Sequence, residues 1–134
     1  MLEPGLTGQS NCLVGPQDLA SAYGNPGADV VATMVVATLL EQASLKAIQD
    51  YLSPDEICVG SRLDFRHLAP TPPGFTVTAQ AKLVEVDRRR LVFEVWASDE
   101  TQEVARGIHE RFILDNAKFQ AQVAAKKAQG PGQK

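Results

Sequence analysis

The sequence predicts an α+β fold in which one long helix lies against an antiparallel sheet of about five strands. Two observations predict this class: apolar residues have helical spacing in one long stretch, residues 30–52, and the stretches around it alternate as strands do. The chain has 134 residues, of which 44% are hydrophobic and 22% are charged. This length and composition are typical of one globular domain and exclude a fibrous or largely disordered chain.

The first expected strand covers residues 6–14, and the long helix follows over residues 30–52. The helix carries one apolar stripe that we expect to be buried, formed by Val36, Leu39, Leu40, Ala43 and Ala47. Thr33 is a candidate cap at its start. Ser53-Pro54 is expected to end it, because the residue before a proline avoids helical backbone angles.

Beyond Pro54 the spacing changes to alternation and predicts four more strands. The first covers residues 57–67, and one of its faces is expected to hold Ile57, Val59, Ser61, Leu63, Phe65 and His67. A proline-rich connection follows at residues 69–74. Strands at 75–86, 91–98 and 103–114 are then expected to form an antiparallel meander. We therefore divide the chain into a domain at residues 1–115 and an Ala-, Gln- and Lys-rich tail at 116–134, which can extend as a helix over 116–129.

Several classes of function are disfavoured by composition. The net charge of −3 lacks the basic excess that nucleic-acid binding needs. The longest apolar stretch, residues 30–40, is too short to span a membrane, and the N-terminus lacks the features of a signal peptide. Cys12 and Cys58 are too few and too far apart for a disulfide framework or a zinc site, and no metal-ligand spacing is present. We expect a cytoplasmic protein without a metal.

Three residues are candidates for chemistry. His67 ends the apolar face of its strand, so it is either a core histidine bonded to backbone or a general base. Glu41 lies at the border of the helical stripe, where it is either a paired catalytic acid or an exposed surface residue. Thr33 would lie about 12 Å from Glu41 along a straight helix. A shared site would therefore require Thr33 to fold back before the first turn, or a second subunit to complete the site.

Weaker candidates lie on the strands and their turns. Gly60 marks either a β-bulge or a close approach of a ligand to the backbone. The arginines at residues 88–90 form either a solvated hairpin tip or an anion site. His109, Glu110 and Arg111 are consecutive in one strand, where neighbours face opposite sides, so we expect that they cannot act as a local triad.

Three segments carry a resemblance to a known family. They are Ala32-Thr33 leading into residues 39–43, the segment of residues 59–72 with sequence VGSRLDFRHLAPTP, and residues 107–112 with sequence GIHERF. In these segments the chain resembles the hotdog-fold thioesterases, and specifically the fluoroacetyl-CoA thioesterase-like family, over about residues 1–115. The order and spacing of Thr33, Glu41, Gly60 and His67 match the family's pattern.

The resemblance implies a central helix wrapped by a curved antiparallel sheet, homodimers whose sheets join edge to edge, and an acyl-CoA thioester bound near the subunit interface. It places the catalytic residues at Thr33, Glu41 and His67. It further implies that Gly60 lies near the thioester carbonyl, where its amide would stabilise the oxyanion, and that Arg111 contacts the substrate. No metal or redox cofactor is implied, since CoA is part of the substrate.

One stretch departs from the family's pattern. Fluoroacetyl-CoA hydrolases carry phenylalanines before the threonine, as a lid over the acyl group, whereas residues 25–31 here contain no aromatic residue. We therefore expect another short acyl chain as substrate. The sequence leaves open whether Glu41 attacks the carbonyl or orients His67.

Two alternative functions fit the same fold. The first is a dimer that binds acyl-CoA without hydrolysing it, which would follow if an ion pair held Glu41 away from the carbonyl. The second is an enoyl-CoA hydratase. It is less favoured because hydratases of this fold usually carry a neighbouring Asp and His near the helix start, and Asp29 has no such neighbour.

Overall fold

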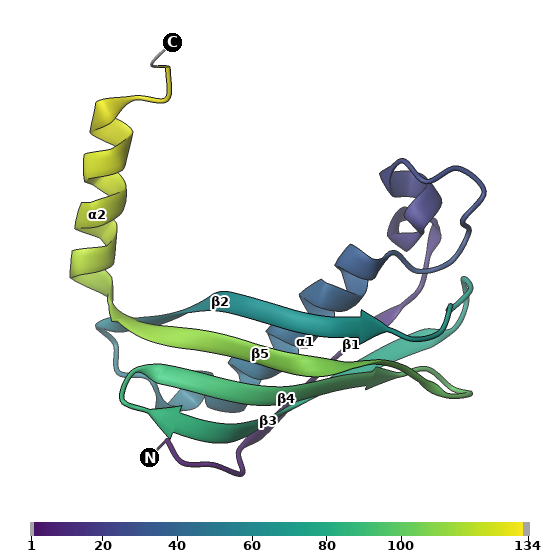
Figure 1. Cartoon of the computed structure of the whole chain (residues 1–134), viewed down its shortest axis with the longest axis horizontal. Helices are drawn as coiled ribbons and strands as arrows, with labels where there is room; N and C mark the ends of the chain where they lie inside the picture. Colours follow the sequence, from purple (N-terminus) through teal and green to yellow (C-terminus); the bar gives the residue numbers. More distant parts are fainter. Residues whose placement is uncertain (1, 133–134) are drawn as a thin grey trace.

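A computed structural model of the chain describes residues 2–132 and contains five strands and two α-helices. In chain order the elements are β1 (Thr7–Leu13), α1 (Thr33–Ile48), β2 (Glu56–His67), β3 (Thr76–Asp87), β4 (Arg90–Ser98), β5 (Glu103–Asp115) and α2 (Asn116–Gln129) (Figure 1). Three short 3₁₀ turns lie at Pro16–Asp18, Ala20–Tyr23 and Gln49–Tyr51. The predicted α+β class and the predicted order of elements are confirmed.

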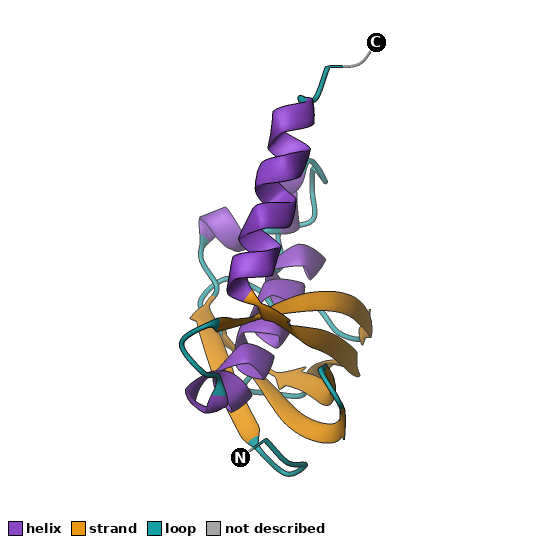
Figure 2. Ribbon diagram, turned by 90° about the vertical axis from the view of Figure 1, so that its left-hand side faces the viewer, coloured by secondary structure: helices purple, strands orange, loops and turns teal. Residues whose placement is uncertain are grey.

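The five strands form one antiparallel sheet with the order β1-β3-β4-β5-β2. Strands β3, β4 and β5 are the predicted meander, and β2 pairs with β5 although they are separated in the chain. The sheet curves around α1, so that the helix lies in its concave side (Figure 2). The strand order leaves β1 and β2 as the two edges of the sheet.

The core lies between α1 and the concave face of the sheet. The predicted stripe of α1 is buried, and Ile48 extends it. The sheet contributes a complementary layer, formed by Val77, Ala79, Ala81, Leu83, Leu91, Phe93, Val95 and Ala97. Burial of each large side chain in this layer contributes about 1.5–3 kcal/mol. Gly8 of β1 allows the close approach of the helix, because a Cβ there would collide with the backbone of Ala43 and Ala47.

Helix α1 is shorter than predicted at both ends. Ala32 is its N-cap in extended conformation, and Thr33 is already the first helical residue. The prediction that Thr33 caps the helix is therefore wrong, because the Thr33 hydroxyl lies 2.8 Å from a nitrogen of His67 instead. At the other end the chain tightens into the 3₁₀ turn Gln49–Tyr51 before Pro54.

Strand β2 does not keep one face along its whole length. A β-bulge between Gly60 and Arg62 adds one residue opposite β5, which reverses the alternation. Before the bulge, Cys58 is buried in the core, whereas after it Leu63 and Phe65 pack against the core. The prediction that Ile57 and Val59 share a face with Leu63 is therefore wrong, since alternation places them opposite Cys58. The bulge itself is one of the two roles expected for Gly60.

The predicted C-terminal helix is present as α2, which projects away from the sheet (Figure 1). None of its residues is buried, although Phe119 is partly covered near the end of β5. Across the part of the chain that the structure describes, no helix combines the length and the apolar character needed to cross a membrane.

Candidate active site

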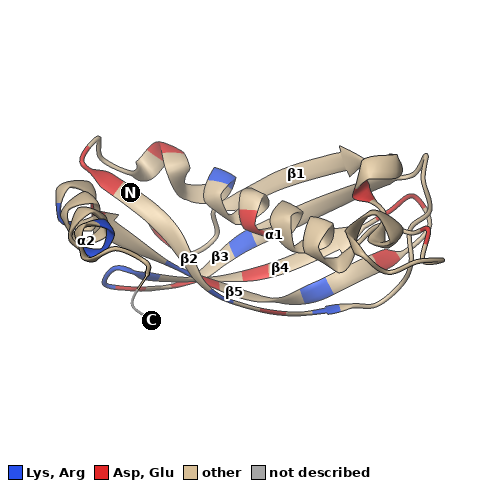
Figure 3. Ribbon diagram, turned by 90° about the horizontal axis from the view of Figure 1, so that it is seen from above, with Lys and Arg blue, Asp and Glu red and all other residues tan. Residues whose placement is uncertain are grey.

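Three of the expected site residues meet between α1 and the middle of the β2–β5 pair. Glu41 is the one acidic residue of α1, the helix labelled in Figure 3, and its Oε1 lies 3.7 Å from Nη1 of Arg111. Gly60 pairs with Arg111 in the sheet. A Cβ built on Gly60 would lie 3.0 Å from Oε1 of Glu41 and 3.2 Å from Cε1 of His109. Glu41, His109 and Arg111 therefore surround the position that a Cβ atom of residue 60 would occupy.

A surface groove of about 320 Å³ opens onto Glu41 and Arg111, and Ala37, Thr38, Gln42 and Leu45 complete its lining. The Glu41 side chain is 46% exposed, whereas that of Arg111 is 7% exposed. The carboxylate therefore reaches into the groove, and the guanidinium forms its base.

Arg111 is held in place by the strands around it. Its Nη2 donates to the carbonyl of Cys58 at 2.8 Å, and its Nε donates to Sγ of Cys58 at 3.3 Å. Burial raises the pKa of the Cys58 thiol, so this partner is neutral. Glu41 is the carboxylate nearest to the guanidinium, and at 3.7 Å it neutralises the charge only in part. The Arg111 guanidinium at the base of the groove is therefore a group that can attract negative charge developing on a bound ligand.

His109 belongs to this cluster, although the sequence pattern indicated no site role for it. Its side chain is buried, and its Nδ1 lies 2.7 Å from the carbonyl oxygen of Arg62. Since a carbonyl only accepts, Nδ1 carries the proton, and Nε2 accepts from Nη1 of Arg111 at 3.2 Å. Burial lowers the pKa of His109, which favours this neutral form. The available signal was its position two residues from Arg111, which places both side chains on one face of β5.

A second pair of expected residues lies at the start of α1. Oγ1 of Thr33 lies 2.8 Å from Nδ1 of His67, at the end of β2. Among the described residues, Nε2 of His67 is buried and has no hydrogen-bond partner. Burial lowers the pKa of His67, so the ring is mainly neutral at pH 7. Both residues border a groove of about 340 Å³ that Asn25, Ala28, Val30 and Pro70 also line.

The structure does not join these two groups within one chain. Thr33 and Glu41 lie in one continuous helix, eight residues apart, which corresponds to about 12 Å along its axis. The alternative in which Thr33 folds back before the first turn is therefore wrong. Glu41, Gly60 and Arg111 form one group, and Thr33 with His67 forms the other.

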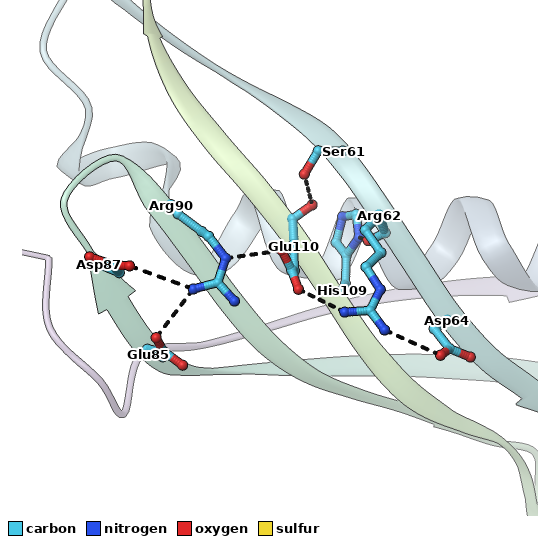
Figure 4. A network of polar contacts seen from close by, with 8 residues as sticks. All are labelled: Ser61, Arg62, Asp64, Glu85, Asp87, Arg90, His109 and Glu110. Carbon is cyan, nitrogen blue, oxygen red and sulfur yellow. Dashed lines mark hydrogen bonds and ion pairs between the residues drawn. The ribbon is translucent and has the colours of Figure 1, made fainter.

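Two of the three arginines at the β3–β4 turn, Arg89 and Arg90, are engaged in ion pairs. Arg90 contacts Glu110, Glu85 and Asp87 at 3.0, 3.2 and 3.9 Å (Figure 4), and Arg89 lies 3.8 Å from Glu56. These pairs favour the interpretation of a charged hairpin tip over that of an anion site.

A comparison with models of known protein families identifies the family of this chain. The model of the fluoroacetyl-CoA-specific thioesterase family matches residues 14–117. The chain belongs to this family. It is 40% identical over 102 residues to the fluoroacetyl-CoA thioesterase of Streptantibioticus cattleyicolor. The matched region covers 76% of this chain and 73% of that protein.

Solved structures confirm the hotdog fold for this family member. A variant of the fluoroacetyl-CoA thioesterase FlK in complex with acetyl-CoA is 33% identical, with a TM-score of 0.86 over 93% of this chain and 98% of that one. A thioesterase superfamily member from Thermus thermophilus is 27% identical, with a TM-score of 0.89 over 95% and 94% of the two chains. A hot-dog-like protein from Thermanaerovibrio acidaminovorans, 21% identical, shares the fold with a TM-score of 0.84 over 97% and 94%.

Proposed function

We propose that this protein is an acyl-CoA thioesterase that hydrolyses a short acyl-CoA to the free acid and CoA. The observation that carries the proposal is the meeting of Glu41 and Arg111 at Gly60, which places no side chain between its backbone and these two polar groups. Membership of the family and the FlK structure with acetyl-CoA support the substrate class.

The acyl group is proposed to differ from fluoroacetyl. Residues 25–31 contain no aromatic side chain, and Asn25, Ala28 and Val30 from this stretch line the groove beside His67. Small and polar residues at these positions leave the groove open where phenylalanines would cover it. We therefore expect activity on several short acyl chains without strong preference for the fluorinated one.

The working unit is proposed to be a homodimer that joins the two groups of site residues. Strand β2 lies at a sheet edge, and within the described chain it pairs with β5 alone. An exposed edge of 12 residues is a template for pairing with a second copy. If two copies of β2 pair antiparallel about a point midway between Gly60 and His67, each Gly60 lies opposite His67 of the partner subunit. The 12-residue edge is long enough to contain this register.

In this composite site His67 is proposed to act as the general base. If Nδ1 carries the proton and donates it to the Thr33 hydroxyl, Nε2 keeps a lone pair that can take a proton from a water bound in the composite site. The water oxygen bonds to the thioester carbon, and the amide of Gly60 with the charge of Arg111 stabilises the oxyanion. The carbon–sulfur bond then breaks, and the imidazolium returns its proton to the CoA thiolate.

Glu41 is proposed to orient this water, or alternatively to attack the carbonyl itself. In the second route the Glu41 carboxylate displaces the CoA thiolate and forms an anhydride, which water then hydrolyses. Both routes use side chains and water alone, so we propose a reaction without a metal or redox cofactor. The free thiols of Cys12 and Cys58 support a reducing, cytoplasmic location.

Thiol release from a panel of short acyl-CoAs tests the activity, and mixing of variants tests the composite site. When His67→Ala and Glu41→Gln chains are co-expressed, a mixed dimer contains one intact site if each site draws on both chains. With random pairing, half of the dimers are mixed, so activity should return to about a quarter of the wild-type level.

A matched control uses two lesions from the same group. Thr33→Val mixed with His67→Ala damages both composite sites, so this mixture should stay inactive. No recovery in the His67→Ala and Glu41→Gln mixture, with mixed dimers verified, would place each site within one chain. Binding of CoA without thiol release from any substrate would instead favour the non-hydrolysing module, and consumption of an enoyl-CoA without thiol release would favour the hydratase.

A further inference from the structure

The bulge of β2 is held on the inner face of the sheet by two side chains of β5. Nη2 of Arg111 donates to the carbonyl of Cys58 at 2.8 Å, and Nδ1 of His109 donates to the carbonyl of Arg62 at 2.7 Å. These two carbonyls flank Gly60, which lies in the bulged segment. The backbone on both sides of Gly60 is therefore anchored to β5 by side chains, where the regular ladder is interrupted.

The outer face of the sheet holds the same bulge through Glu110. Its carboxylate accepts from Nη1 of Arg62 at 3.0 Å and from Nε of Arg90 at 3.0 Å (Figure 4). Its backbone carbonyl accepts from the hydroxyl of Ser61 at 3.2 Å. Arg62 is thus held on one face by its backbone and on the other by its side chain.

The residues His109, Glu110 and Arg111 are called here the bulge clamp. As alternation along a strand predicts, His109 and Arg111 face one side of β5 and Glu110 faces the other. All three nevertheless bind the bulged segment of β2, each from its own side of the sheet. Within the clamp, His109 also links the two hydrogen bonds on the inner face, because it contacts both the Arg62 carbonyl and Arg111. Its Nδ1–H holds the Arg62 carbonyl, and its Nε2 accepts from the guanidinium of Arg111.

We propose that His109 is a positioning residue of the thioesterase site, which sets the backbone at Gly60 and the guanidinium of Arg111 in one fixed geometry. This inference rests on the proposed function, in which Gly60 and Arg111 stabilise the oxyanion. A neutral ring is required, since a protonated Nε2 has no lone pair for Arg111. Displacement of oxyanion donors by about 1 Å costs about a hundredfold in rate.

Two substitutions separate the contacts of His109. His109→Asn keeps a donor near the place of Nδ1, for the Arg62 carbonyl, and removes the acceptor for Arg111. His109→Gln keeps an acceptor near the place of Nε2 and removes the Nδ1 donor. We expect each to lower kcat by about tenfold to a hundredfold, with KM changed less than about threefold, and His109→Leu to lower it further.

Asp64→Asn is the matched control. Asp64 lies on the same strand, contacts the same Arg62 at 3.5 Å, and has a side chain that is 70% exposed. We expect its kcat to stay within about twofold of the wild type, because exposed ion pairs contribute little. If the His109 variants lower the melting temperature while kcat per folded molecule is unchanged, His109 is only structural and the proposal is overturned.

A measurement that needs no activity keeps the two proposals distinguishable. In imidazole ¹⁵N spectra of the wild-type protein, assigned with His109→Asn, the His109 ring should be neutral with its proton on Nδ1. It should still be mainly neutral at pH 6.5, in surroundings that contain Arg111, Glu41 and Glu110. The Nε2–H tautomer, or free titration near pH 6.5, overturns the positioning role even if thiol release is normal. Absence of thiol release in the wild type, with the Nδ1–H ring observed, overturns the proposed function instead.

Discussion

The two histidines of this protein differ in how their ring nitrogens are used. Burial lowers the pKa of both, and both are predominantly neutral at pH 7. Nδ1 of His67 contacts Thr33, and its Nε2 has no hydrogen-bond partner among the described residues. Both nitrogens of His109 are occupied, by the Arg62 carbonyl and by Arg111. A histidine with an unused nitrogen can exchange a proton with substrate, whereas one with both nitrogens bonded fixes its neighbours.

Replacement of His67 tests the first half of this comparison and has the largest expected effect. His67→Ala should lower kcat by about a hundredfold to ten-thousandfold, because it removes the proposed general base. The fold should persist, since the residue lies at the end of β2. Thiol release and thermal unfolding measure the two quantities. Near-normal turnover of a verified substrate by the variant would show that His67 is not the base.

Two glycines of the β2–β5 pair test the second half, because they separate site geometry from folding. An added Cβ at Gly60 meets side-chain atoms of Glu41 and His109, of which Glu41 can rotate. Gly60→Ala should therefore fold and lower kcat by about tenfold to a hundredfold. An added Cβ at Gly107 meets the backbone of Asp64 and Phe65, so Gly107→Ala should lose about 3 kcal/mol of stability.

Denaturant unfolding and kcat per folded molecule measure the two outcomes. If Gly60→Ala loses as much stability as Gly107→Ala, the space at Gly60 serves packing. In that case the bulge clamp does not act on catalysis through the backbone at Gly60.

The smallest expected effect concerns pH. Because the pKa of His67 lies below 6.5, its neutral form predominates at pH 6.5 and can increase by less than about twofold above it. Between pH 7.5 and 6.5 we expect kcat/KM to fall by less than about twofold, with the main loss at lower pH as His67 takes up its proton. A pH profile of kcat/KM in the wild type measures this. A loss of fivefold or more over the same interval would indicate a base whose pKa is raised.

Local patterns predicted most of the fold. The strands, the central helix and the helix over 116–129 follow from periods of about 3.6 and 2 residues, which depend on neighbours in the chain. The order of the three consecutive strands follows from short connections. Family resemblance selected Thr33, Glu41, Gly60, His67 and Arg111 as the site residues, and the structure divides them into two groups.

Tertiary structure alone decided which face of β2 each residue occupies and which partner each histidine nitrogen contacts. The bulge of β2 depends on its register with β5, about fifty residues away in the chain, so alternation along β2 could not predict which side Ile57 faces. The role of His109 depends on a carbonyl of β2 and a guanidinium of β5 that meet only when the sheet forms. The sequence determined which side chains are present and their local spacing. Pairing between distant strands determined which of them meet, because hydrogen bonds across a sheet join residues by position in space.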